Sequence, residues 1–158
     1  MNAFIGAIVI CTTPWMIIMT IGYVVRRGYY SEVDLQVFNQ GRTGGMYWFS
    51  NGINWRGMAA WLPAAVGGLV FANYPPLIEG PFRNAAGGVD LSLFVAIGMA
   101  AVIYVGLLFA FPEPRYVFGP QGPRWVPSSN ATPPGIVDNA SASAHRARGL
   151  HAGDGAGV

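Results

Sequence analysis

The chain has 158 residues, of which 53% are hydrophobic and only 10% are charged, against about a quarter charged in a typical soluble domain. Its net charge is only +2 and its nine basic residues, all arginine, are scattered along the chain, which excludes a nucleic-acid-binding stripe. The single cysteine, Cys11, excludes an internal disulfide and a cysteine-built metal site. Because Cys11 lies in an apolar run, we interpret it as a small hydrophobic filler.

The first predicted element is a membrane-spanning helix at residues 3–25. None of these 23 residues is acidic or basic. At roughly 1.5 Å per residue, a helix of this length covers about 34 Å, enough to cross the hydrocarbon core of a bilayer. A secretory signal carries basic residues before a shorter apolar stretch, whereas here Arg26 and Arg27 follow the run. We therefore expect a retained helix.

The middle of this helix contains the sequence Thr12, Thr13, Pro14. Pro14 has no amide hydrogen and leaves the carbonyl of Ile10 without its usual donor, while the threonine hydroxyls can satisfy local backbone groups. Two interpretations stay open. One is an ordinary proline kink, common in membrane helices, and the other is a break that exposes backbone to substrate, as in many transporters.

The connector after the first helix is predicted to form a short interfacial helix at residues 32–39. Ser31 can cap it, and Glu32 and Asp34 lie in its first turn, where the helix dipole favours negative charge. Aromatic residues of the types that favour the headgroup boundary come next: Tyr47, Trp48, Phe49 and Trp55. An aromatic ligand cage is the alternative interpretation of this group.

Two further uncharged runs predict the second and third membrane-spanning helices, at residues 57–74 and 91–111. Prolines directly after each run are expected to end the helix. Both helices carry small residues at every fourth position, a pattern that lets helix backbones approach closely in lipid. These residues are Ala60, Ala64, Gly68 and Ala72 in the second helix and Ser92, Ala96 and Ala100 in the third. The two stripes predict a packed helix bundle.

The distribution of arginine predicts the orientation in the membrane. Two regions carry most of the arginines near the helices, the connector at residues 26–56 and the segment after the third helix, while Arg83 alone lies between the second and third helices. The positive-inside rule then places the first connector and the C-terminus in the cytoplasm, as in a multi-pass protein of the plasma membrane. Residues 1–127 form the transmembrane region, and residues 128–158 predict a disordered cytoplasmic tail.

The sequence contains no recognisable catalytic motif or cluster of catalytic residues. No histidine, acid or lysine lies within the predicted spans, which argues against a proton relay or a charge pair inside them. We find no phosphate-binding glycine loop, zinc spacing or nucleophile elbow, and His145 and His151 in the tail have no further ligand near them. We therefore expect no enzyme, catalytic residue, metal site or cofactor.

Several segments resemble the C-terminal part of the purine–cytosine permease family, the nucleobase–cation symporters for cytosine, purines, uracil, thiamine, allantoin and hydantoins. The resemblance covers about residues 1–127 and is most specific at Gly52-Ile53-Asn54-Trp55-Arg56. The other segments that carry it are residues 22–30 (GYVVRRGYY), 34–39 (DLQVFN), 47–49 (YWF), 86–92 (AGGVDLS) and 111–116 (FPEPRY).

The resemblance implies a fold of about twelve helices built on an inverted repeat, of which this all-α integral membrane protein would supply the last three. It implies alternating access coupled to Na⁺ or H⁺ in the complete transporter. The residues that hold substrate stay unknown, because the helices that bind it in this family lie mostly upstream. Since the tenth helix of such folds helps to gate access, the implied gate candidates are Thr12, Thr13, Pro14 and Trp15, and the family motif is Asn54, Trp55 and Arg56.

The sequence therefore predicts a C-terminal fragment of a nucleobase-type permease, with the lipid bilayer and missing upstream transporter helices as its partners. The alternative is a small structural membrane subunit that packs against a larger membrane partner through its Ala/Gly stripes. A membrane-bound enzyme is a third and weaker interpretation.

Overall fold

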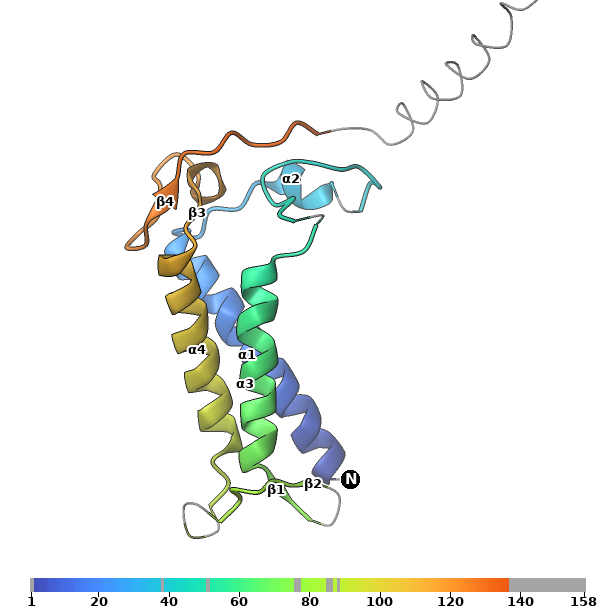
Figure 1. The fold of residues 1–158 in the computed structure, drawn as a ribbon. Helices are drawn as coiled ribbons and strands as arrows, with labels where there is room; N and C mark the ends of the chain where they lie inside the picture. The colour runs from blue at the N-terminus through green and yellow to red at the C-terminus, as the bar shows by residue number, and fades with distance from the viewer. Residues whose placement is uncertain are drawn as a thin grey trace, which may run out of the picture.

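The computed structural model describes residues 2–37, 39–50, 52–75, 78–84, 87 and 89–136. Three long helices run along one another in a bundle: α1 (Asn2–Val25), α3 (Trp55–Phe71) and α4 (Ser92–Ala110) (Figure 1). The short helix α2 (Glu32–Gln36), the strands β3 (Glu113–Pro114) and β4 (Ser128–Ser129) and the 3₁₀ helix η1 (Arg115–Phe118) lie at one end of the bundle. At the other end are β1 (Asn73–Tyr74) and β2 (Ile78–Glu79).

Two helices in the described part of the chain are long and apolar enough to cross a membrane. They are α1, over Ala3–Val25 with a mean hydropathy of 2.1, and α4, with 19 residues and a mean hydropathy of 2.5. The protein is thus mostly helical, and α1 continues as a helix through Pro14. The third predicted span, at residues 57–74, corresponds to α3, which has 17 residues.

Local hydrogen bonds decide where α3 begins and ends. Asn54 caps its start by accepting a hydrogen bond from the Gly57 amide, so the helix begins at Trp55, before the uncharged run. At the other end Ala72 adopts an extended conformation, and the two residues that follow form β1, which pairs antiparallel with β2. The helix therefore ends one turn before the prolines that the sequence suggested as its stop.

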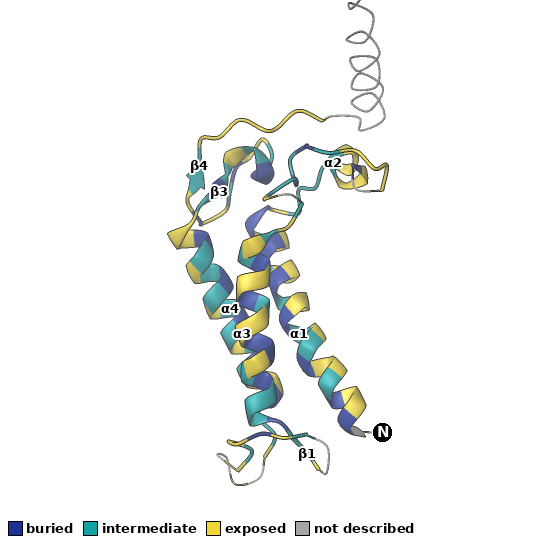
Figure 2. Ribbon diagram, turned by 45° about the vertical axis from the view of Figure 1, so that its right-hand side comes forward, coloured by how far each residue is buried: buried dark blue, intermediate teal, exposed yellow. Residues whose placement is uncertain are grey.

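The small-residue stripes lie along the contact between α3 and α4, a pairing that the spacing alone did not specify. Ala60, Ala64 and Ala72 are fully buried, as are Ala96 and Ala100 on the facing helix. A Cβ atom built on Gly68 would lie 2.7 Å from Ile10 Cγ2, closer than real Cβ atoms come, and 3.1 Å from Ala96 Cβ, a tight contact. The bundle thus depends on the absence of larger side chains along this seam, and its buried residues face inward between the helices (Figure 2).

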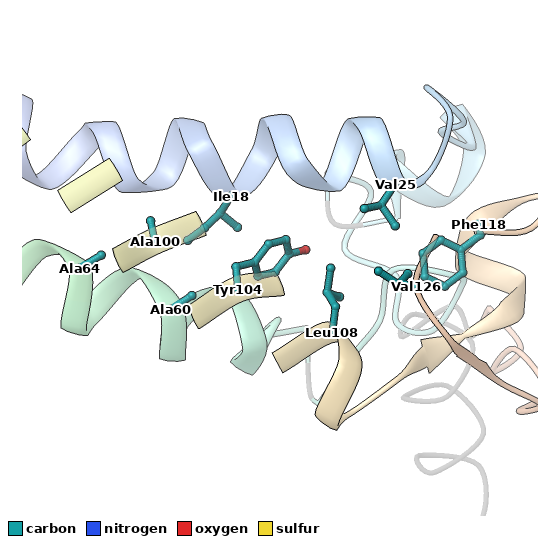
Figure 3. Packing of buried hydrophobic residues seen from close by; sticks show 9 residues of the cluster. All are labelled: Ile18, Val25, Ala60, Ala64, Ala100, Tyr104, Leu108, Phe118 and Val126. Atoms are coloured by element: carbon teal, nitrogen blue, oxygen red, sulfur yellow. The ribbon is translucent and has the colours of Figure 1, made fainter. Parts of the chain in front are cut away.

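The chain after α4 folds back over the end of α1. Val25, Leu108 and Tyr104 pack there against Phe118 and Val126 (Figure 3). We call residues 113–136 the C-terminal segment.

Backbone hydrogen bonds hold the C-terminal segment in this position. The Arg124 amide donates to the Val25 carbonyl at 3.1 Å, and the Gly45 amide donates to the Pro134 carbonyl at 3.1 Å. β4 also pairs in parallel with β3. Of the predicted tail, Ser128 and Ser129 form β4 and residues 130–136 are exposed, whereas residues 137–158 lie outside the described residues, so its disorder stays a prediction.

The short helix of the first connector is shorter than predicted: α2 covers Glu32–Gln36, whereas a helix over residues 32–39 was expected. Ser31 caps α2, as its position predicts, by accepting a hydrogen bond from the Asp34 amide. The Asp34 carboxylate then accepts a 2.9 Å hydrogen bond from the Met46 amide, and the Ser31 amide donates to the Tyr47 hydroxyl at 3.0 Å. These bonds fold the connector back on itself beside the end of α1.

Candidate functional site

The four gate candidates do not share one face of α1. Pro14 is buried and Thr13 is half-buried, whereas Thr12 is exposed and Trp15 keeps 47% of its surface exposed. The Thr12 hydroxyl donates a 2.8 Å hydrogen bond to the Ile8 carbonyl, so it satisfies the backbone of its own helix. Of the four residues, only Thr12 and Trp15 therefore face the same open space.

That space is a groove of about 350 Å³ between α1 and α3, lined by Cys11, Thr12, Trp15, Met58 and Trp61. Most of its lining is apolar or aromatic, and the groove opens widely on the side of the bundle. It can accept an apolar side chain, an acyl chain or a flat aromatic ring. We call it the α1–α3 groove.

A hydrogen bond between helices crosses the floor of the α1–α3 groove. The indole nitrogen of Trp61 in α3 donates to the Cys11 carbonyl of α1 at 2.8 Å. Cys11 lies in the turn that precedes Pro14, where the proline leaves the helix short of a donor. Trp61 was not predicted as a functional residue. The only indication in the sequence is that its indole N–H lies in a predicted span, where a polar group needs a hydrogen-bond partner. The expected free carbonyl was that of Ile10, and the carbonyl that receives the bond is the next one along.

The family motif joins the start of α3 to the end of α4. The Arg56 guanidinium donates from Nε to the Phe111 carbonyl at 2.8 Å and from Nη2 to the Pro112 carbonyl at 3.3 Å. Trp55 contacts the Phe111 ring edge-on, with 5.2 Å between ring centroids. With Asn54 as the cap of α3, all three residues of the motif therefore act at the helix ends. Arg56 thus satisfies two backbone carbonyls just beyond the last residue of α4.

A buried ion pair lies at the same end of the bundle. Arg26 Nη2 and Glu113 Oε2 are 3.0 Å apart, and the two side chains are 10% and 1% exposed. The pair connects the end of α1 to β3 across 87 positions of sequence. Sequence analysis did not predict it, because each residue lies just beyond a predicted span and nothing local indicates that the two meet.

The surroundings of Arg26 keep its guanidinium charged. Burial alone lowers the pKa of Arg26, but the negative charge of Glu113 and the oxygens of Tyr104 and Tyr30 outweigh burial, so its pKa is raised. The rings of Tyr30 and Tyr47 lie 5.8 and 6.0 Å from the guanidinium carbon, within the range of cation–π attraction. Among the described residues, Arg26 Nε and Glu113 Oε1 have no hydrogen-bond partner.

Arg26 separates two cavities. The inner cavity, of about 120 Å³, lies between α1, α3 and α4, and its polar lining includes Arg26, Tyr30, Asn54 and Tyr104. Trp15 lines both this cavity and the α1–α3 groove. Gly22 lies beside these polar groups, and a Cβ there would be in ordinary contact with Arg26 Nη1 at 3.5 Å and with the Tyr104 hydroxyl at 3.6 Å.

The outer cavity, of about 270 Å³, lies on the other side of Arg26. It is lined by Arg26, Arg27, Gly28, Tyr29, Phe118, Pro120 and Gln121. The residues come from the end of α1 and from the C-terminal segment, so the cavity exists only because that segment folds back. Neither cavity contains a metal site, since the part of the chain that the structure describes holds no group of three His, Cys, Asp or Glu residues placed to bind an ion.

Comparison with known proteins gives one match. The model of a protein family described as permease for cytosine/purines, uracil, thiamine, allantoin matches residues 1–96. The matched stretch includes α1, α3, the start of α4 and the residues Asn54, Trp55 and Arg56, whereas the segment at 111–116 that also resembles this family lies beyond it. No curated protein and no solved structure matches the chain.

Proposed function

Because the chain belongs to the family of permeases for cytosine/purines, uracil, thiamine and allantoin, we propose that it works as part of a transporter that moves a nucleobase or related compound across a membrane. The match over residues 1–96 is the observation that carries this proposal. The family is one of transporters, which agrees with the expectation that the chain is not an enzyme. Together with the apolar helices α1 and α4, it indicates a membrane protein.

We further propose that all three long helices span the plasma membrane and form the last three helices of the transporter. At roughly 1.5 Å per residue, the 17 residues of α3 reach about 26 Å, at the short end of the spanning range. The contact of α3 with both other helices supports a third crossing, because α3 runs alongside two helices of spanning length (Figure 1).

The arrangement of the arginines supports a cytoplasmic C-terminus. The connector at residues 26–54 and the C-terminal segment lie at the same end of the bundle, and they contain Arg26, Arg27, Arg42, Arg115 and Arg124 (Figure 1). Arg83 lies at the opposite end and pairs with Glu79. The positive-inside rule then assigns the arginine-rich end to the cytoplasm.

Alternating access, coupled to Na⁺ or H⁺, is the mechanism that we propose for the complete transporter. In it, α1 changes its position relative to α3 as the gate opens and closes. Such a movement has to break the hydrogen bond between Trp61 and the Cys11 carbonyl, and it changes the α1–α3 groove that Thr12 and Trp15 line. Pro14 favours this place for a bend because its missing donor weakens the helix there.

The exposed side of α1 is where other membrane segments would pack. It carries large apolar residues with half or more of their surface exposed, among them Phe4, Ile5, Met16 and Met19. Further helices of the transporter, or another membrane subunit, would cover this face. The Ala/Gly stripes are already buried between α3 and α4, so a structural subunit would have to bind its partner through the exposed apolar residues on the outer sides of the helices instead.

Uptake of labelled cytosine, uracil, allantoin and hydantoin tests the proposal, in cells that express the chain within its genomic reading frame. We expect uptake of at least one compound, and we expect Thr12→Val to reduce it. Thr20→Val is the matched control. The Thr20 hydroxyl, like the Thr12 hydroxyl, donates a 2.8 Å hydrogen bond to a carbonyl one turn back, that of Met16, but Thr20 does not line the α1–α3 groove. If none of the four compounds enters cells that carry the protein in their membrane, the transport proposal fails for these substrates and the structural subunit is favoured.

A further inference from the structure

We propose that the outer cavity at the end of α1 binds the phosphate of an anionic lipid headgroup. We call this cavity the headgroup pocket. The inference goes beyond transport and rests on the proposed function only for placing this end of the bundle at the membrane surface. It assigns a role to Arg27 and Tyr29, which line the pocket and take no part in the gate or the family motif.

The headgroup pocket has the right size and position for a lipid phosphate. Its volume of about 270 Å³ is close to the lower limit for pockets that hold small organic molecules. It opens directly after α1, a helix whose length matches a bilayer, so its mouth lies where headgroups are concentrated. Tyr29, Phe118 and Pro120 supply apolar walls, which suit the glycerol and upper acyl carbons of a lipid better than a free phosphate ion.

The charge of the pocket selects an anion. Arg27 is exposed and forms no salt bridge with any carboxylate in the described ranges. Arg26 is buried on the other wall, with its Nε unpartnered among the described residues. Glu113 offsets part of this charge, but its side chain is 1% exposed and is not among the residues that line the pocket. Arg26 and Arg27 both line the pocket. Guanidinium groups are the usual protein partners of a phosphate, because their planar N–H groups bond two oxygens at once.

The backbone at the end of α1 holds Arg27 in an unusual place. The Arg27 amide donates to the Val24 carbonyl at 3.2 Å, and the Gly28 amide donates to the Tyr23 carbonyl at 3.0 Å, which together cap the helix. Arg27 has a φ of 55° in this cap, a left-handed conformation that glycine usually supplies. The chain thus places an arginine where a glycine would fit with less strain, next to a pocket that needs positive charge.

Further arginines strengthen the attraction without entering the pocket. Arg115 and Arg124 are exposed on the neighbouring C-terminal segment and are not among the pocket-lining residues. Basic groups next to the inner leaflet attract anionic lipids over a distance of about one Debye length. They therefore raise the local concentration of such lipids, whereas Arg27 would decide whether a headgroup is held at a defined site.

Competition binding in detergent tests the pocket with the full chain and does not depend on uptake. A fluorescent phosphatidylglycerol is bound to the purified protein in a non-ionic detergent and displaced by dioctanoyl phosphatidylglycerol, dioctanoyl phosphatidylcholine or inorganic phosphate. We expect phosphatidylglycerol to compete at least tenfold better than either of the other two. Arg27→Gln should weaken binding about tenfold, as expected for the loss of a charge-assisted pair of hydrogen bonds.

Two matched variants make the result specific. Arg124→Gln removes the same charge from the same end of the protein and leaves the pocket unchanged, so it should weaken binding less than about threefold. Arg27→Gly removes the charge and gives the helix cap its favoured residue, so the protein stays folded and binding should fall as in Arg27→Gln. Arg27→Lys should restore part of the affinity.

Three outcomes would overturn the inference. Equal competition by phosphatidylcholine would show that the pocket does not select an anion, and equal competition by inorganic phosphate would assign it to a free ion. Equal loss in Arg27→Gln and Arg124→Gln would show diffuse electrostatic attraction and no defined site. Because uptake is not measured in this experiment, a failed transport assay with intact lipid selectivity, or the reverse, separates the two proposals.

Discussion

Replacing Glu113 by glutamine should destabilise the protein by about 3 kcal/mol, because it leaves the Arg26 charge buried without its counterion. The two charged atoms are 3.0 Å apart. At an effective dielectric constant of roughly 20, this separation corresponds to an attraction of about 5 to 6 kcal/mol. Glutamine keeps the shape and one acceptor oxygen, so the lower part of the usual 3–5 kcal/mol cost of breaking a buried pair is expected.

Arg26 cannot escape this cost by losing its proton. Burial favours its neutral form, and the variant lacks the Glu113 charge that raises its pKa. The ordinary pKa of an arginine nevertheless lies so far above neutral pH that the guanidinium keeps its proton inside a protein. The variant therefore has to keep a buried cation, or to open the contact between α1 and the C-terminal segment. Opening would also expose Val25, Phe118 and Val126, which pack together beside the ion pair.

Thermal unfolding of the purified protein in detergent measures the effect. For a chain of this length, about 3 kcal/mol corresponds to a fall in Tm of about 6 to 12 °C. Glu79→Gln is the matched control, because it removes the same group from the exposed pair with Arg83, whose side chains are 39% and 35% exposed. Its cost should stay below about 1 kcal/mol. If both variants lower Tm equally, the Arg26–Glu113 pair does not hold the C-terminal segment and the reasoning is wrong.

Three further predictions concern the helix contacts and the turn before α4. Trp61→Phe keeps an aromatic ring but removes the indole donor, so it should cost about 1 kcal/mol in thermal unfolding. Gly68→Ala should cost about 1 to 3 kcal/mol, because the added Cβ would overlap side chains of the facing helices. Gly98→Ala is the control: no atom lies within 4 Å of its Cβ, so it should be neutral or stabilise the protein by up to about 1 kcal/mol. Burial raises the pKa of Asp90, but hydrogen bonds, among them that from the Ser92 amide, outweigh burial and lower the net pKa below 3.8. The contribution of Asp90 to stability is therefore present above that value and lost as the pH falls through the folded pKa. Asp90→Asn should therefore flatten the fall in Tm below about pH 4, and an unchanged acid profile would contradict this.

The parts of the fold that the sequence predicted are those that depend on neighbouring residues. Uncharged runs indicated where α1, α3 and α4 lie, because only residues close in sequence set the length and polarity of a helix. The spacing of four between small residues indicated which faces pack, and Ala64 and Ala96 are fully buried as that pattern predicts. Ser31 indicated the cap of α2 in the same local way.

The ends of the elements were less predictable, because their hydrogen-bond partners lie elsewhere. Residues 72–74 leave α3 where their backbone pairs with β2, and Gly80 approaches so closely that a Cβ there would lie 2.0 Å from the Val70 carbonyl oxygen. The tail beyond residue 127 was expected to be disordered from its composition. That expectation stays a prediction, but composition gave no sign of the long-range backbone pairings of this stretch, of β4 with β3 and of Gly45 with the Pro134 carbonyl.

The amino-acid sequence by itself determined that this is a helical membrane protein of the permease family, because apolar length, small-residue spacing and family motifs are written in consecutive residues. Only the tertiary structure decided which polar groups meet. Arg26 finds Glu113 across 87 positions and Trp61 finds the Cys11 carbonyl across 50. Such pairs depend on how the connectors and the C-terminal segment bring distant residues together. A buried charge or donor therefore has its partner only in the folded protein.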